Sequence, residues 1–397
     1  MLFQFAKRIL AETDKRLLWK FAWNCGYKGM RSVQLHKNRL NRGQYFPPFL
    51  FISLTNSCQL RCQGCWVDVD KPRRMLSLEE TNRLINDAKQ QGCSFFGLLG
   101  GEPLLHPNLL DILRAHPDCY FQLFTNGHLL TDELAGEFAQ IGNVTPLISI
   151  EGSQTISDQR RGRPNVYSKT LTGLENCRRH RLITGVATSV CQSNVDDLVS
   201  EEWLHDLIEL GVFYVWFYTY RPVGPKPSPE LALRPDQLLA VRRFIVEMRC
   251  KLPIAIIDAY WDDRGRALCP MATGVSHHIG PGGDIEPCPI LQFACETIRD
   301  PGGIYDIMTR SRFLADMRGT AAEATRGCIV LERPDLVRQV VQRTGARDTT
   351  QRGTALAELE AMTARPSQHS PGNEVPEKHW AYRFAKKHWF FGFGAYA

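Results

Sequence analysis

The chain has 397 residues, enough to bury a substantial core, so we expect one large domain with appendages. Its residues are 43% hydrophobic and 23% charged, with 31 Gly and 23 Pro, a composition that excludes collagen, a coiled coil and wholesale disorder. No apolar stretch approaches the length of about 18 residues that a membrane-spanning helix needs. Charged residues interrupt positions 2–23, unlike a secretory signal, so we expect an intracellular protein.

Cysteine usage and charge distribution narrow the function further. The cysteine count of 13 is odd, and in a reducing compartment clustered thiols bind metal more often than they form disulfides. Positive charge gathers at the two ends: residues 1–46 hold ten Lys and Arg against two acids, and residues 377–397 hold four against one. The body between them is slightly acidic, which excludes a nucleic-acid groove spread over the main domain.

From residue 50 to residue 220, short apolar runs alternate with longer helical stretches, which predicts parallel β/α units. The predicted strands cover residues 49–55, 94–99, 119–125, 145–151, 183–191 and 212–220. The predicted helices cover residues 78–91, 107–116, 131–141, 166–180 and 194–210, three of them starting at the capping residues Ser77, Thr131 and Asn194. The pattern favours an α/β fold of the partial (β/α)6 TIM-like barrel type, with an open doubly wound sheet as the alternative.

The remaining chain has a different texture. A Pro-rich linker over 221–229 precedes a predicted helix over 234–251, a loop-rich stretch over 261–290, a helical stretch over 336–363 and a connector over 364–377. We therefore expect four parts: a basic amphipathic segment (1–46), the barrel (47–225), a linker helix with a small cysteine-rich extension (226–335), and a helix with a flexible linker and a basic aromatic tail (336–397).

The sharpest chemical signal is a loop with three cysteines, Cys58, Cys62 and Cys65, directly after the first predicted strand. Parallel β/α folds place their active sites at such strand ends. A structural zinc site needs a fourth Cys or His nearby, and the next cysteine is Cys93. Three thiolates instead suit a 4Fe-4S cluster that leaves one iron open to a substrate or cofactor.

This cysteine spacing resembles that of the radical S-adenosylmethionine (SAM) superfamily, and a second segment agrees. Gly100, Gly101, Glu102 and Pro103 end the second predicted strand and resemble the family's segment for the methionine amino group. Paired glycines let main chain approach a ligand closely, and Glu102 offers an acceptor for the ammonium.

Four further residues resemble family positions around the cofactor. The resemblance places Asn126 in the cofactor pocket, Ser149 and Glu151 near the ribose, and Arg161 near the methionine carboxylate. A generic turn at Asn126 and a surface position for Arg161 are the alternatives. Gly64 departs from the family pattern, because many members carry an aromatic residue before the third cysteine.

A second metal signal lies in the cysteine-rich extension. The spacing of Cys269, Gly283 and Cys288 is similar to the opening of the SPASM and Twitch extensions, which hold auxiliary iron-sulfur clusters. Residues 280–284 predict a hairpin that brings the two thiols together. Cys295 and Cys328 complete the candidate ligands for a second, auxiliary 4Fe-4S cluster, with buried structural cysteines as the alternative. The pair at 277–278 is predicted to be two solvent-facing loop histidines.

The resemblance implies an enzyme that cleaves SAM reductively at the first cluster, generates a 5′-deoxyadenosyl radical and modifies an unactivated C–H or C=C position. It also implies an external one-electron reductant of the flavodoxin or ferredoxin type. No residue is identified as a hydrogen donor. Family members with such extensions act on peptides, cofactor precursors, or lipids and isoprenoids. A non-catalytic iron-sulfur carrier is the alternative from another class.

The basic aromatic ends favour a lipid or isoprenoid substrate slightly over a peptide or a cofactor precursor. In residues 2–22 the apolar side chains lie on helical faces with Lys and Arg beside them, and the final stretch mixes aromatic and basic residues. Such mixtures suit a lipid headgroup boundary, and packing onto the barrel is equally compatible with them. We expect a cytoplasmic protein, with peripheral contact at the inner membrane face as a further expectation.

Overall fold

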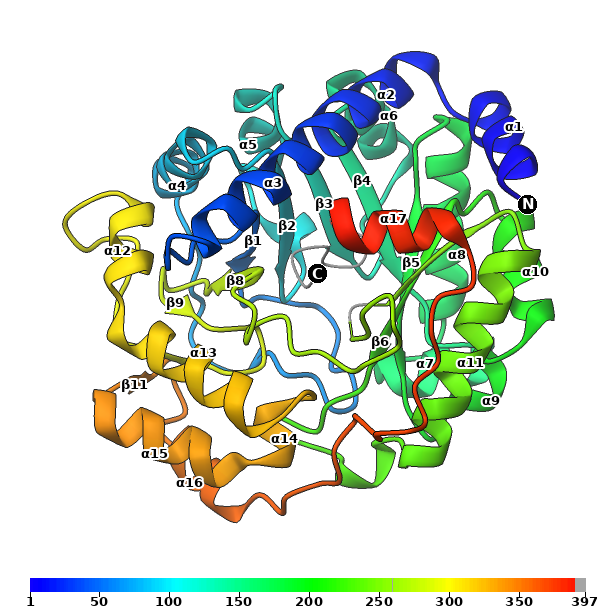
Figure 1. The fold of residues 1–397 in the computed structure, drawn as a ribbon. Coiled ribbons are helices and arrows are strands. Elements are labelled where there is room, and N and C mark those ends of the chain that lie inside the picture. Colours follow the sequence, from blue (N-terminus) through cyan, green and yellow to red (C-terminus); the bar gives the residue numbers. More distant parts are fainter. Residues whose placement is uncertain (259, 390–397) are drawn as a thin grey trace.

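Six parallel β/α units form the centre of the computed structural model, which describes residues 1–258 and 260–389 (Figure 1). The strands are β1 (Phe49–Thr55), β2 (Phe95–Gly100), β3 (Tyr120–Thr125), β4 (Val144–Ser149), β5 (Gly185–Val190) and β6 (Tyr214–Thr219). The helices between them are α4 (Leu78–Gln90), α5 (Leu109–Ala115), α6 (Asp132–Ile141), α7 (Gln154–Arg161), α8 (Val166–Arg179), α9 (Val195–Leu198) and α10 (Glu201–Glu209), with a short 3-10 turn, η2 (Pro103–Leu105).

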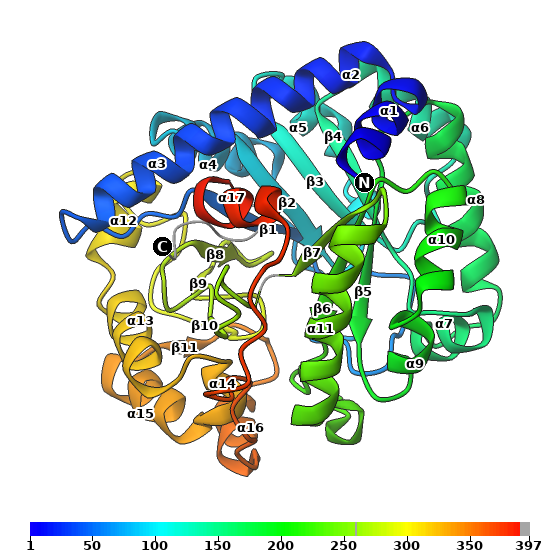
Figure 2. The same cartoon turned by 45° about the vertical axis from the view of Figure 1, so that its right-hand side comes forward.

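The sheet extends beyond these six strands on both sides. Its order is β7-β6-β5-β4-β3-β2-β1-β8-β9, in which β7 (Ala255–Asp258) lies parallel to β6 and β8 (Ser276–Ile279) lies parallel to β1. The short β9 (Ile285–Glu286) pairs antiparallel with β8. The strands follow in sequence around a curve with the helices outside it, so the fold is a partial TIM-like barrel and not a closed one (Figure 2). The sequence did not predict β7, β8 or the helix α7.

Aromatic side chains fill the inside of the curved sheet. Every residue of β1 is buried, because one face packs under the outer helices and the other faces the barrel interior. The interior set includes Phe51, Tyr120, Tyr214 and Trp216, each at most 8% exposed. Tyr214 also shares a hydrogen bond of 2.9 Å with the Thr145 hydroxyl, so its polar end is satisfied inside the core.

Two of the three predicted helix caps are confirmed. Ser77 and Glu80 form a reciprocal capping box at the start of α4, and the Thr131 hydroxyl accepts a hydrogen bond from Leu134 N at the start of α6. Asn194 occupies the predicted N-cap position of α9, but its side chain caps no N–H of that helix and accepts from Cys191 N at 2.7 Å instead.

The first 40 residues form helices that lie across the amino ends of the strands: α1 (Leu2–Glu12), α2 (Lys15–Lys20), a π-helical segment η1 (Phe21–Tyr27) and α3 (Lys28–Leu40). Arg8 donates to Val212 O at 2.7 Å, just before β6, and Lys20 donates to Ile141 O at 2.6 Å, just before β4. Asn24 reaches Cys119 O, just before β3. The basic N-terminal segment therefore packs onto the barrel, which was one of the two arrangements that the sequence allowed.

Beyond β6, a 3-10 turn η3 (Pro229–Leu231) leads to the long helix α11, and the extension after β9 is mainly helical. These helices are α11 (Pro235–Lys251), α12 (Ile304–Arg310), α13 (Arg312–Ala324), α14 (Ile329–Glu332), α15 (Pro334–Thr344) and α16 (Ala355–Ala361). The strand β11 (Arg347–Asp348) lies between α15 and α16 and pairs antiparallel with β10 (Phe293–Ala294), which precedes α12. The predicted helical stretch 336–363 is therefore two helices and a strand.

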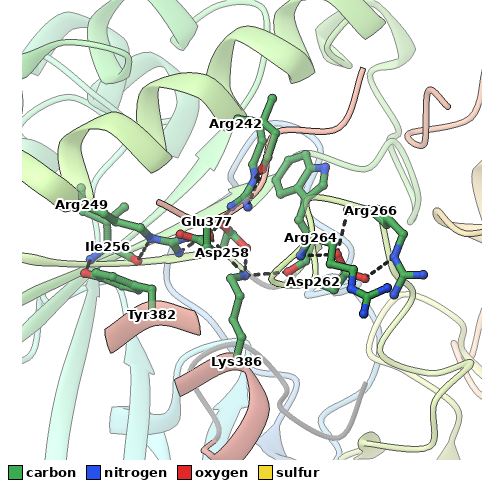
Figure 3. A network of polar contacts seen from close by, with 12 residues as sticks. Arg242, Arg249, Ile256, Asp258, Asp262, Arg264, Arg266, Glu377, Tyr382 and Lys386 are labelled. Carbon is green, nitrogen blue, oxygen red and sulfur yellow. Dashed lines mark hydrogen bonds and ion pairs between the residues drawn. The ribbon is translucent and has the colours of Figure 1, made fainter. Parts of the chain in front are cut away.

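A buried group of charges holds the C-terminal segment to the barrel (Figure 3). Asp258 at the end of β7 and Glu377 face Arg242 and Arg249 of α11 and Lys386 of α17 (Trp380–His388), all at most 1% exposed. The connector 364–377, predicted to be flexible, has no helix or strand, but its last residue is fixed in this group, which we call the clasp. The end of the predicted aromatic tail, 390–397, lies outside the described residues.

Candidate active site

The three cysteines of the first loop lie at the carboxyl end of β1. Cys58, Cys62 and Cys65 line one cavity of about 610 Å³. The C-terminal end of α7 fixes this loop, because Gln63 N donates to Arg160 O at 2.8 Å and Gly162 approaches the Arg61 carbonyl too closely for any side chain. The loop is therefore preformed at the strand end where the sequence predicted it.

Nitrogen donors point at two of the three sulfurs. Leu60 N donates to Cys58 Sγ at 3.4 Å and Asn126 Nδ2 approaches the same sulfur at 3.9 Å, while Arg161 donates to Cys62 Sγ at 3.7 Å. Burial raises the pKa of Cys58 to about 11 and that of Cys65 to about 12, so binding a metal releases protons from these thiols. Hydrogen bonds to sulfur are what cluster-bound thiolates receive, and the donor set fits an iron-sulfur cluster.

Tyr220 explains the departure at Gly64. Gly64 has φ of +68°, and a Cβ there would lie 2.7 Å from Tyr220 Cζ and 2.8 Å from Cε2. The aromatic ring next to the third cysteine thus comes from the segment after β6 instead of from the loop itself. The Arg160 guanidinium lies over this ring, with Cζ 5.2 Å from its centroid.

The Gly-Gly-Glu-Pro segment at the end of β2 packs against the main chain that leads into the cysteine loop. Gly100 and Gly101 line the cavity, and a Cβ on Gly101 would lie 2.6 Å from Asn56 O, so the glycines let β2 approach the main chain that leads into the cysteine loop. Glu102 is fully buried and neither it nor Pro103 lines the cavity. The contact of Glu102 with a cofactor amino group therefore stays a prediction.

Glu102 instead organises the next strand end. Its carboxylate accepts from Thr125 Oγ1 at 2.7 Å, from Asn126 N at 2.8 Å and from Leu104 N at 3.1 Å. Burial raises the pKa of Glu102 against these three hydrogen bonds. Through Asn126, which reaches Cys58, the carboxylate positions a group that contacts the cysteine loop.

Glu151 and Arg161 form an ion pair at the cavity wall. The Arg161 guanidinium contacts the Glu151 carboxylate and Cys62 together, and both side chains line the cavity with Ser149. The second Glu151 oxygen accepts from Ser189 N at 3.0 Å. Burial alone would lower the pKa of Arg161, but Glu151 and Cys62 raise it. Arg161 is thus largely buried beside the cysteine loop and not a surface residue. The contacts of Ser149, Glu151 and Arg161 with a cofactor stay predictions.

A second cysteine trio faces the same cavity. Cys269, Cys288 and Cys328 all line it, and their thiols influence one another electrostatically. Between the first two, Gly283 (φ of +82°) donates to Gly280 O at 2.9 Å and closes the predicted hairpin between β8 and β9. Burial raises the pKa of Cys269 to about 11. The structure therefore brings together three of the four cysteines predicted for an auxiliary site.

Cys295 is not with this trio. It follows β10, whose pairing with β11 carries it to the end of α15, where its thiol lies 3.6 Å from Thr344 O, and it does not line the cavity. The structure therefore does not bring Cys295 into the cavity with the other three predicted ligands.

The two adjacent histidines are also misplaced by the sequence prediction. His277 and His278 lie in β8, beside β1, and are 3% and 0% exposed. His278 joins three elements, since its ring nitrogens contact Ser53 Oγ at 2.7 Å and Glu286 Oε2 at 2.6 Å. The strand β8 is only four residues long, and its apolar pattern is too short to predict a buried strand from the sequence.

Arg221 and Tyr260 are cavity residues that the sequence analysis missed. Arg221 follows β6, and its Cζ lies 4.1 Å from the centre of the Tyr260 ring. Its guanidinium also contacts Cys328; burial alone would lower the pKa of Arg221, but Tyr260 and Cys328 raise it. A cation placed directly after an aromatic strand, at the carboxyl edge of the sheet, was the signal available in the sequence.

In the described part of the chain, no group of three His, Cys, Asp or Glu side chains is arranged closely enough to hold a single metal ion. The fit of the two trios to iron-sulfur clusters rests on their donor sets: three thiols each, facing one cavity, with N–H groups directed at the sulfurs of the first.

Comparison with known proteins agrees with this geometry. Residues 52–198 match the Radical SAM superfamily. The chain is 30% identical over 233 residues to the GTP 3′,8-cyclase of Parasynechococcus marenigrum, covering 52% of this chain and 65% of that protein. It is 27% identical over 180 residues to the sporulation killing factor maturation protein SkfB of Bacillus subtilis, covering 45% and 43%. The match thus spans between two fifths and two thirds of these relatives' lengths.

A solved structure shows the same fold. Streptococcus suis SuiB bound to S-adenosylmethionine superposes with a TM-score of 0.62 at 15% identity, covering 73% of this chain and 75% of SuiB, and SuiB has also been solved bound to its precursor peptide SuiA. The chain therefore shares the partial-barrel fold of SuiB, and residues 52–198 of it match the Radical SAM superfamily. No helix in its described part has both the length and the hydrophobicity to cross a membrane.

Proposed function

We propose that this chain, whose residues 52–198 form a radical SAM domain, is an enzyme that cleaves SAM at the Cys58, Cys62 and Cys65 loop and modifies a substrate held between the two cysteine trios. One observation carries the proposal: both trios and the pair Glu151 and Arg161 line a single cavity. A bound, reduced cluster with SAM would supply a 5′-deoxyadenosyl radical that takes a hydrogen atom from the substrate.

Side chains of this protein hold the cysteine loop in position. Asn126 and Arg161 direct N–H groups at the sulfurs of Cys58 and Cys62, which favours the charged thiolates. Glu151 neutralises Arg161 at the wall. Tyr220 fills the space beside Gly64, so the loop has no freedom to rotate there. Together these contacts fix the loop before any ligand binds.

The second trio would hold an auxiliary cluster of the SPASM or Twitch type. Three thiols leave one position of a cubane without a cysteine in this trio, and Arg221 lies against Cys328 at that wall of the cavity. An external one-electron reductant of the flavodoxin or ferredoxin type would reduce the enzyme. The free state of all 13 cysteines fits a reducing, cytoplasmic compartment.

A peptide is the substrate class that the observations favour, with a cofactor precursor as the alternative. The likeness to SkfB supports the first and the likeness to GTP 3′,8-cyclase the second. The lipid substrate expected from the basic aromatic ends loses support, because the N-terminal end packs at the amino ends of the strands and the cavity lies at the carboxyl ends.

Anaerobic reconstitution with iron and sulfide, followed by SAM and dithionite, tests the proposal. The wild-type chain should release 5′-deoxyadenosine and methionine, and Cys58→Ala should release neither. Cys250→Ala is the matched control, since Cys250 is exposed on α11 and lines no part of the cavity, and it should retain activity. A chain that binds iron but releases no 5′-deoxyadenosine would be the carrier and not the enzyme.

Iron analysis separates the two sites. The wild-type chain should hold about eight irons, and replacing either trio by alanines should leave about four. Cys295→Ala should leave the iron content unchanged. A fall to about four on the Cys295 change, or no fall on loss of the second trio, would contradict the auxiliary site.

A further inference from the structure

The exposed hydrophobic side chains of this protein gather on its terminal helices. Among the described residues, all nine exposed large hydrophobic side chains lie on α1, α2, η1, α3 or α17; they are Leu2, Phe3, Leu10, Trp19, Trp23, Tyr27, Met30, Trp380 and Phe384. Both views place α17 beside α3, on the side of the molecule that α1 to α3 cover (Figures 1 and 2). We call this surface the terminal face.

One row of the terminal face has a regular order. Lys15, Trp19, Trp23, Tyr27 and Arg31 follow at four-residue intervals along α2, η1 and α3, and all five are exposed. The two tryptophan rings stack with centroids 6.2 Å apart, and Trp23 stacks on Tyr27 at 4.9 Å. Neither Lys15 nor Arg31 is paired with any residue that the structure describes. The row is thus an aromatic ladder with a free cation at each end.

The charged side chains on the row's own segment are of one sign, although Asp118, before β3, lies beside Lys28. Residues 15–46 contain eight Lys and Arg and no Asp or Glu. The two acids before them are occupied, since Glu12 pairs with Arg8 and Asp14 caps α2. Between α3 and α17 lies a groove of about 330 Å³, lined by Tyr27, Met30 and Phe384 together with Arg31, Lys37 and Lys387.

We propose that the terminal face docks on an anionic lipid surface. Trp and Tyr rings partition to the boundary between headgroups and acyl chains, and free Lys and Arg beside them attract anionic headgroups. The projecting ladder enters that boundary, and the basic groove accepts a phosphate headgroup. A protein partner would have to supply carboxylates along the whole row, whereas an anionic leaflet presents negative charge everywhere.

Docking in this way fixes the orientation of the active site. The terminal face covers the amino ends of the strands, and the cavity lies at their carboxyl ends, about 20 Å away along six-residue strands. The cysteine cavity therefore faces away from the lipid. The surface acts as an anchor and not as a substrate entrance, and this proposal stands whether or not the proposed chemistry does.

Flotation of the full-length protein with vesicles tests the anchor. We expect binding to phosphatidylglycerol vesicles and not to phosphatidylcholine vesicles, with affinity lowered about thirtyfold by Lys15→Glu with Arg31→Glu, at roughly tenfold per 1.4 kcal/mol and about 1 kcal/mol for each cation. Trp19→Ala with Trp23→Ala should also weaken binding. Arg310→Glu with Arg312→Glu, a matched pair of exposed cations on α12 and α13, should leave it unchanged.

A far-ultraviolet circular dichroism spectrum equal to that of the wild type shows that each variant is folded. Equal binding by wild type and both terminal-face variants would overturn the proposal, as would a loss of binding in the Arg310 and Arg312 variant. A wild-type chain that ignores the vesicles but forms a dimer that the Trp19 and Trp23 changes dissociate would also overturn it, since a second copy would then be the occupant.

Discussion

Replacing Asp258 by Asn should destabilise the protein more than any other single charge removal outside the active site. The clasp holds three cations, Arg242, Arg249 and Lys386, and two carboxylates. Asp258 binds all three cations, with distances of 2.8 Å to Arg242, 3.1 Å to Arg249 and 2.8 Å to Lys386. The Asn variant would leave three buried cations facing Glu377 alone.

The magnitude follows from burial. Every side chain of the clasp is at most 1% exposed, and removing one partner of a buried ion pair costs about 3–5 kcal/mol. Burial alone would raise the pKa of Asp258, but Lys386, Arg249 and Arg242 hold it far below its usual range. Because this pKa is depressed in the folded state, the contribution is complete at neutral pH and is lost only as the pH falls below about 4.

Two comparisons sharpen the test. Glu247→Gln removes a pair with Lys251 on the same helix, at 2.7 Å between two half-exposed side chains, and should leave the urea midpoint nearly unchanged. Lys386→Met removes the excess cation of the clasp and should cost less than Asp258→Asn, about 1–3 kcal/mol. Urea unfolding under anaerobic conditions, followed by tryptophan fluorescence, measures all three variants.

The reasoning would be refuted if Asp258→Asn cost no more than Glu247→Gln. It would also be refuted if Lys386→Met were the more damaging change, because the charge balance would then not control the stability of the clasp.

The other predictions concern Gly64 in the cysteine loop, the buried carboxylate of Glu102 and the buried His277 of β8. Gly64→Ala should lower iron occupancy and 5′-deoxyadenosine formation, since its Cβ meets the Tyr220 ring, and adding Tyr220→Ala should recover part of both. Glu102→Gln should lower the free energy of unfolding by roughly 1–3 kcal/mol, because an amide NH2 would face one of the three buried donors; unchanged urea midpoints would contradict this. Burial, with Arg318, lowers the pKa of His277 to about 3, so the unfolded chain takes up a proton first as the pH falls below about 6.5. Between pH 7 and pH 5 this group should remove about 2 kcal/mol of stability, and His277→Phe should show a correspondingly smaller fall in its urea midpoint over that range.

Much of the fold could be predicted because its signals are local. Each of the six strands is a short apolar run between polar helices, and capping residues such as Ser77 mark helix starts. The added strands were missed for a tertiary reason. β7 and β8 are four residues long, and their strand conformation depends on pairing with β6 and β1, which lie far from them in the sequence. The sequence around His277 and His278 predicts a loop, because only the pairing of β8 with β1 buries them.

The site divides in the same way. Cysteine spacing within one loop is a local property, and it predicted the trio of Cys58, Cys62 and Cys65. Which distant cysteines meet is set by strand pairing, so β10 and β11 removed Cys295 from the second trio in a way that spacing could not reveal. The direction of the Glu102 side chain likewise depends on donors from the next strand end, Thr125 and Asn126.

Electron paramagnetic resonance of the reduced protein with and without SAM tests the central claim most directly. A variant with Cys269, Cys288 and Cys328 replaced by alanine leaves only the first cluster to observe. We predict that adding SAM changes the signal of this cluster, because its open iron becomes a ligand site for SAM. A signal that stays the same under saturating SAM would contradict the proposed active site.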